Sequence, residues 1–77
     1  MHIDYLVRMA NDIGAFFASE KDQHVAAESI QQHIRRFWDP RMRSRIIAYY
    51  RETGGKDLDG PVRTAVQQLA EETAAKA

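Results

Sequence analysis

HIRRFWDPRMRSR, residues 33–45, is the stretch that predicts how this chain folds. Within it, Phe37 and Trp38 end one helical pattern, and Asp39 and Pro40 begin the next. Aspartate is a preferred N-cap, because its carboxylate accepts hydrogen bonds from the first free backbone N–H groups of a helix. Proline fits the first helical position, where its missing N–H costs nothing. The stretch therefore predicts a helix, a sharp corner and a second helix, with an aromatic pair inside the corner and arginines on both sides.

Positive charge is concentrated around this corner, although the chain as a whole is neutral. The 77 residues include eleven basic and eleven acidic side chains. Between His33 and Arg51, six arginines and one aspartate give a local net charge of +5. Exposed Trp and Arg are typical of binding hot spots, so we expect a docking surface here, with a merely solvated helix face as the alternative. For Trp38 the alternative is packing in the core of the domain.

Apolar residues recur at helical spacing on both sides of the corner and predict an all-α fold, a small bundle of three to four helices. The chain is long enough for one small domain, covering residues 1–77. The predicted helices and a frayed C-terminal tail cover residues 3–18, 23–37, 40–53, 61–70 and 71–77.

Helix-capping residues mark most of these boundaries. Either Ser19 or Asp22 caps the second helix. The pair Gly54 and Gly55 ends the third, because glycine readily takes the left-handed conformation that stops a helix. Pro61 then stands at the first position of the fourth helix.

The first predicted helix carries two apolar stripes. The main stripe consists of Ile3, Leu6, Val7, Ala10, Ile13 and Phe17. A second stripe of Tyr5, Met9 and Phe16 makes the apolar arc wider than a surface helix needs. Either neighbouring helices cover this second stripe, or it faces another chain.

Stripes on the other three predicted helices complete the expected core. They consist of Ala26, Ile30, Ile34 and Phe37, then Met42, Ile46, Tyr49 and Thr53, then Val62, Ala65, Val66 and Leu69.

The sequence offers little material for catalysis or metal binding. It has no cysteine, and its three histidines are scattered, so His33 is interpreted as a packed or hydrogen-bonded surface residue. Phosphate-binding and hydrolase motifs are missing, and 77 residues are too few to enclose a large pocket. No run approaches the roughly 20 apolar residues of a membrane span, and the N-terminus does not resemble a signal peptide.

Nucleic-acid binding is the alternative function. Two helices joined by a tight corner, with arginines on the second, superficially resemble a helix-turn-helix. The zero net charge argues against this interpretation. Asp39 would also repel phosphates near the first turn of the recognition helix.

Three segments resemble a known family. LVRMANDIGAFF (residues 6–17), HIRRFWDPRMR (33–43) and GPVRTAVQQL (60–69) are similar to the delta subunit of the soluble, NAD-dependent, molybdenum-containing formate dehydrogenase. The block FWDPRMR, residues 37–43, is the most specific part of this resemblance.

The resemblance implies a cytoplasmic, non-catalytic accessory subunit. In that family a large alpha subunit holds the molybdenum or tungsten pterin cofactor and iron–sulfur clusters, and the beta and gamma subunits carry flavin, further clusters and the NAD site. The delta chain holds no known cofactor and is thought to support assembly or stability of the complex. The expected partners are thus the alpha subunit and its beta and gamma partners, while a homodimer of the isolated chain stays an open alternative.

The corner supplies the candidate partner-binding residues. These are Arg35, Arg36, Phe37, Trp38, Asp39, Pro40, Arg41, Met42, Arg43 and Arg45. Catalytic, cofactor-binding and metal-binding residues are not assigned.

Overall fold

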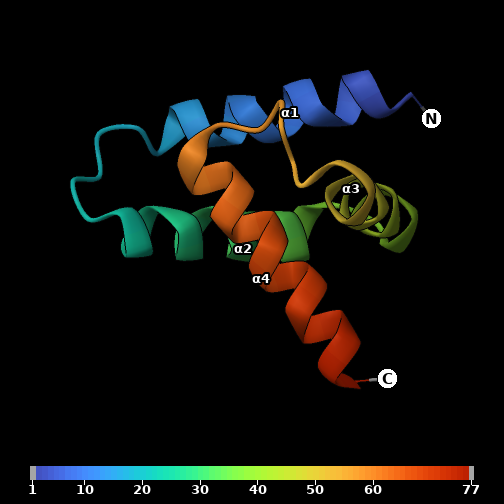
Figure 1. Cartoon of the computed structure of the whole chain (residues 1–77). Coiled ribbons are helices and arrows are strands. Elements are labelled where there is room, and N and C mark those ends of the chain that lie inside the picture. Colours follow the sequence, from blue (N-terminus) through green and yellow to red (C-terminus); the bar gives the residue numbers. More distant parts are fainter. Residues whose placement is uncertain (1, 77) are drawn as a thin grey trace.

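The computed structural model describes residues 2–76, and in this range the chain forms four α-helices and no strand (Figure 1). The helices are α1 (Ile3–Phe16), α2 (Gln23–Phe37), α3 (Pro40–Thr53) and α4 (Gly60–Lys76). This arrangement confirms the predicted small all-α bundle.

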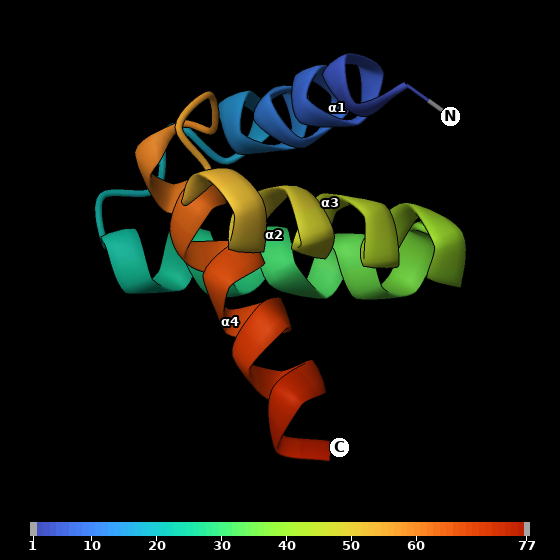
Figure 2. The same ribbon diagram turned by 45° about the vertical axis from the view of Figure 1, so that its right-hand side comes forward.

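Helix α4 packs against each of the other three helices. Its contacts are most extensive with α2 and then with α3, whereas α2 and α3 make little direct contact with each other. Figures 1 and 2 show α4 crossing α2, with the C-terminal half of α4 projecting beyond the rest of the molecule. Helix α1 also contacts both α2 and α3, so the relative positions of these two helices depend on α1, on α4 and on the short corner that joins them.

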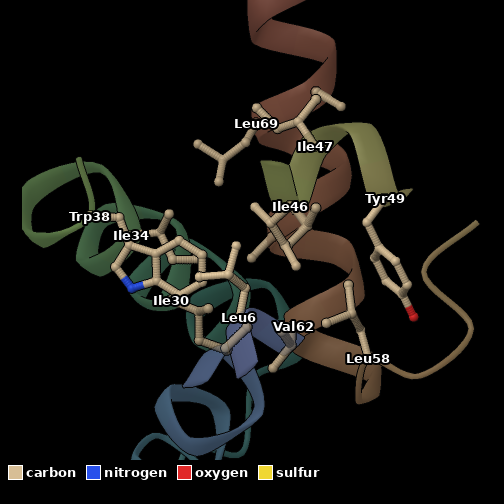
Figure 3. Close-up of a cluster of buried hydrophobic side chains, with 14 residues drawn as sticks. Leu6, Ile30, Ile34, Trp38, Ile46, Ile47, Tyr49, Leu58, Val62 and Leu69 are labelled. Carbon is tan, nitrogen blue, oxygen red and sulfur yellow. The ribbon is translucent and has the colours of Figure 1, made fainter. Parts of the chain in front are cut away.

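The hydrophobic core draws residues from all four helices and from the loop before α4 (Figure 3). It consists of Leu6, Ala10, Ile30, Ile34, Trp38, Ile46, Ile47, Tyr49, Leu58, Val62, Ala65, Val66, Leu69 and Ala70. The predicted stripe on α4 is confirmed in full, because each of its four residues is buried. On α3, Ile47 is buried in addition to the predicted residues Ile46 and Tyr49.

Capping residues act as the sequence predicts. Of the two candidates for the start of α2, Asp22 is the cap, and its carboxylate accepts from the backbone N–H groups of His24 (2.9 Å) and Val25 (3.3 Å). Gly54 ends α3 in the left-handed conformation, with φ 74°. A residue with a Cβ is strained there, which explains the helix stop at this glycine.

The first helix is shorter than predicted, because it ends at Phe16 and not at residue 18. Its last turn tightens: the N–H of Phe17 donates to the carbonyl of Gly14 (3.2 Å), and the N–H of Ala18 donates to that of Ala15 (3.2 Å). Such i→i−3 bonds are typical of helix ends, and they turn the chain toward α2.

The fourth helix is longer than predicted. Residues 71–77 were expected to fray, but α4 continues to Lys76, and Ala77 lies outside the described residues. Two contacts hold the added turns: Gln31 donates to Glu72 (3.2 Å), and the Thr73 hydroxyl donates to the Leu69 carbonyl (2.9 Å). Alanine and glutamate are also strong helix formers.

The second stripe of α1 divides between the two predicted environments. Met9 packs against the core of its own chain. Tyr5 and Phe16 are 58% and 79% exposed. Neither alternative therefore holds for the whole stripe.

A loop between α3 and α4 is fastened to α1 by one side chain. The amide of Asn11 donates to the carbonyl of Asp57 (3.0 Å), and its oxygen accepts from the N–H of Asp59 (3.0 Å). The hydroxyl of Tyr49 donates to the carboxylate of Asp57 (3.2 Å) and accepts from the backbone N–H of the same residue (3.1 Å). These bonds fix the point at which the chain enters α4.

Candidate functional site

Asp39 and Pro40 build the corner between α2 and α3 as predicted. The carboxylate of Asp39 accepts from the backbone N–H of Met42 (3.0 Å), and Pro40 occupies the first turn of α3. Both residues are exposed, but the hydrogen bond commits the Asp39 side chain to capping.

Trp38 is buried, so of its two expected positions core packing holds and not the exposed position of a docking residue. Only 4% of this residue is accessible. As the C-cap of α2, it has extended backbone angles (φ −88°, ψ 137°), so its side chain leaves the helical register. Figure 3 shows the indole beside Ile34, inside the core. Trp38 therefore supports the corner from within and presents no ring to a partner.

Phe37, in contrast to Trp38, is exposed. It was expected inside the corner and in the apolar stripe of α2, but it is 71% exposed. Its ring lies against the half-buried ring of His33, with centroids 4.7 Å apart and planes tilted by 42°. This contact gives the phenyl ring a defined place on the surface.

Arg43 and Arg35 are used inside the molecule. The guanidinium of Arg43 donates to the carbonyl of Arg35 (3.2 Å) and also to that of Trp38, where α2 ends. Arg35 forms an ion pair with Glu72 of α4. Met42 is partly buried and packs against the core. These three predicted partner-binding residues thus have structural contacts of their own.

Three of the predicted arginines remain exposed and uncommitted. Among residues 2–76, the side chains of Arg36, Arg41 and Arg45 form no hydrogen bond or ion pair. We call Arg36, Phe37, Arg41 and Arg45 the corner surface. The surface combines three guanidinium groups with one exposed phenyl ring, and this composition suits a partner that offers acidic and apolar groups.

The part of the chain that the structure describes contains neither a metal-binding cluster nor a helix that could span a membrane. Across residues 2–76, the His, Asp and Glu side chains form no group of three or more that could hold a metal ion. None of the helices in this range has the length and apolar character needed to cross a membrane.

Sequence reasoning missed the surface between α3 and α4. Arg51 and Glu72 both line an open groove there, although neither was among the predicted site residues. The arginine run did include Arg51, but its partner, the carbonyl of Ala70 (3.2 Å), lies on a helix whose position the sequence does not reveal.

Comparison with known protein families gives a match over most of the chain. Residues 5–66 match the model of a family described as "NADH-dependant formate dehydrogenase delta subunit FdsD". The matched range contains the whole corner and ends within α4. Neither a curated protein nor a solved structure matches the chain significantly.

Proposed function

Because the chain belongs to the FdsD family of NADH-dependent formate dehydrogenase delta subunits, we propose that it is a non-catalytic accessory subunit that binds the molybdenum-containing alpha subunit. In this proposal the corner surface makes the contact, the chain holds no cofactor of its own, and binding takes place in the cytoplasm. The alpha, beta and gamma subunits supply all the redox chemistry.

The corner surface is the observation that carries the proposal. Phe37 is largely exposed, and Arg36, Arg41 and Arg45 have no partner within residues 2–76. Burying an exposed phenyl ring in an interface stabilises binding by about 1.5–3 kcal/mol. Guanidinium groups beside it add orientation, because each presents five N–H donors in a fixed plane.

Contacts within the chain hold the corner rigidly. The buried Trp38, the Asp39 cap and the Arg43 bonds to two carbonyls all hold the corner in one conformation. A surface that is already ordered loses less conformational entropy on binding. The family match covers this whole segment, which supports assigning it to the shared role of the family.

Retention of the alpha subunit tests the proposal. A tagged chain is expressed with the other subunits, and the amount of alpha subunit that co-purifies is measured for Phe37→Ala and for the double variant Arg41→Glu/Arg45→Glu. We expect each to lower retention by at least about tenfold, the effect of losing a hot-spot contact.

Two matched controls accompany these variants. Val25→Ala removes an exposed apolar side chain from the opposite end of α2, and Lys21→Glu/Lys56→Glu makes the same change in net charge in two loops. Both controls should retain the alpha subunit. Equal retention by all four variants, with helicity unchanged by circular dichroism, would show that the corner surface is only solvated.

The supporting role is tested in cells that lack the chain. We expect a lower yield of molybdenum-loaded alpha subunit, restored by the wild-type chain and not by Arg41→Glu/Arg45→Glu. Metal analysis of the purified enzyme gives the readout. An unchanged molybdenum content would contradict a role in assembly or stability.

A further inference from the structure

A second basic surface adjoins the corner surface, in an open groove of about 500 Å³ between α3 and the C-terminal half of α4. We call it the arginine groove. Arg35, Arg43 and Arg51 line it together with a single carboxylate, that of Glu72. Three guanidinium groups against one carboxylate leave a net charge of +2, so the groove favours a negatively charged occupant.

The guanidinium groups of the groove are already positioned by the fold. Arg51 donates through one nitrogen to the carbonyl of Ala70 (3.2 Å), and Arg43 donates through one nitrogen to the carbonyls of Arg35 and Trp38. A guanidinium carries five N–H donors, so both arginines keep further donors for an acceptor in the groove. Little side-chain entropy remains to be lost when an acceptor arrives.

Apolar side chains make up part of the same groove. The exposed Pro40 and the half-buried Ala48 contribute to its lining, together with the buried Ile47 and Leu69. Figure 3 shows Ile47 and Leu69 side by side where α3 meets α4. An occupant that meets both kinds of lining needs an apolar side chain next to a carboxylate.

At one edge of the groove, an arginine already binds a carboxylate of the same chain. Arg35 pairs with the carboxylate of Glu72, which also accepts from the Gln31 amide (3.2 Å). A side-chain carboxylate is thus the acceptor that the structure itself places on one of these arginines. The apolar lining and the Glu72 carboxylate are both unfavourable for a nucleic-acid backbone, which is polyanionic.

We propose that the arginine groove binds an acidic segment of another subunit of the formate dehydrogenase complex, with an Asp or Glu carboxylate on Arg51 and Arg43 and an apolar side chain over Pro40 and Ala48. The proposal rests on the proposed function, because it presumes that the chain is bound within that complex. It adds a second contact next to the contact made by the corner surface.

Carbodiimide cross-linking identifies the occupant directly. The variant Arg51→Lys is assembled into the complex and treated with a water-soluble carbodiimide, which joins a lysine amine to a contacting carboxylate as an amide while the reagent takes up the water released. Peptide mass spectrometry should find the substituted lysine at position 51 joined to an Asp or Glu of another subunit. Arg8→Lys, on the exposed face of α1, serves as the matched control and should give no such product.

Other products overturn the proposal. A cross-link only to Glu72 of the same chain would mean that the groove is closed by its own α4. A cross-link to a second copy, recognised by mixing isotope-labelled and unlabelled chains, would make the groove a homodimer contact. Absence of any product at position 51 in an intact complex would contradict the groove proposal but not the proposed function. Failure of the chain to co-purify with the other subunits would contradict both.

A cysteine footprint gives an independent measurement, because the chain has no cysteine of its own. Thr73→Cys places a thiol in the lining of the groove, and Ser19→Cys places one in the exposed turn after α1. We expect maleimide to modify the thiol at position 73 much more slowly in the complex than in the free chain, and the thiol at position 19 equally fast in both. Equal rates at position 73 would contradict an occupied groove.

Discussion

Phe37 and Trp38 are neighbours in the chain, but Phe37 is exposed and Trp38 is buried. The helix ends between them: Phe37 is the last residue of α2, and Trp38 already has extended backbone angles. Phe37 therefore follows the outer face of the helix, while Trp38 turns inward and is almost fully buried. One residue is available to a partner, and the other holds the fold.

This contrast predicts opposite effects of two substitutions. Trp38→Ala should lower the free energy of unfolding by about 3–5 kcal/mol, because it empties a large buried site. Phe37→Ala should change it by less than about 0.5 kcal/mol, because the ring is exposed. Chemical denaturation followed by circular dichroism measures both. A large loss of stability in Phe37→Ala would mean that its effect on partner retention is indirect.

Local rules account for what the sequence predicts correctly at this scale. Asp39 as a cap and Gly54 as a helix stop are both confirmed, because each depends only on residues nearby in the chain. The burial of Trp38 could not be predicted in the same way, since it depends on core residues that other helices contribute.

At the scale of the helices, α1 and α4 approach each other very closely at Gly14. A Cβ added to Gly14 would lie 2.4 Å from Cγ2 of Val62, a distance that real side chains do not tolerate. Val62 is β-branched and fully buried, so it has little freedom to move aside. Glycine at this position lets α1 lie directly on α4.

Gly14→Ala should lower the free energy of unfolding by about 1–2 kcal/mol, because overpacking outweighs the gain in helix propensity. Gly60→Ala is the control, since a Cβ there meets nothing within 4 Å. In a Val62→Ala background the cost of Gly14→Ala should largely vanish, because the two sites are in contact. The same cost in both backgrounds would show that the crossing of α1 and α4 is not what constrains Gly14.

The helices themselves could be predicted well, but their ends and partners less so. The bounds of α2 and α3 follow from caps and glycines, whereas the end of α4 depends on Glu72 reaching α2. Asn11 likewise bonds the loop before α4, 46 residues away in the chain. Contacts at such separations leave no periodic signal in a single sequence, so the loop attachment and the arginine groove appear only in the folded chain.

At the scale of the whole molecule, the last turns of α4 contribute more to the surface than to the core. Leu69 and Ala70 are the last residues of the core, and the turns beyond them are held by the Glu72 contacts and the Thr73 bond. An exposed ion pair such as Arg35–Glu72 stabilises a fold by at most about 1 kcal/mol. The described chain therefore contains a self-sufficient core and a projecting end that shapes the groove.

Removing residues 71–77 should leave a folded chain whose free energy of unfolding is lower by about 1 kcal/mol. Leu69→Ala in the full chain, which cuts into the core, should cost about 2–5 kcal/mol. Thermal and chemical unfolding compare the two variants. Cooperative loss of helicity in the shortened chain would show that the last turns of α4 belong to the core.

Because α2 and α3 scarcely contact each other, their mutual angle is set by the corner and by the two helices that contact both, α1 and α4. A ligand that tightens α3 against α4 in the groove would also limit the motions open to the corner, and the corner's own ligand would do the same for the groove. Such mutual restriction is thermodynamic linkage, and it is reciprocal by necessity. Two modest contacts on this small chain would then reinforce each other, so that the assembled state is favoured over either half-bound intermediate.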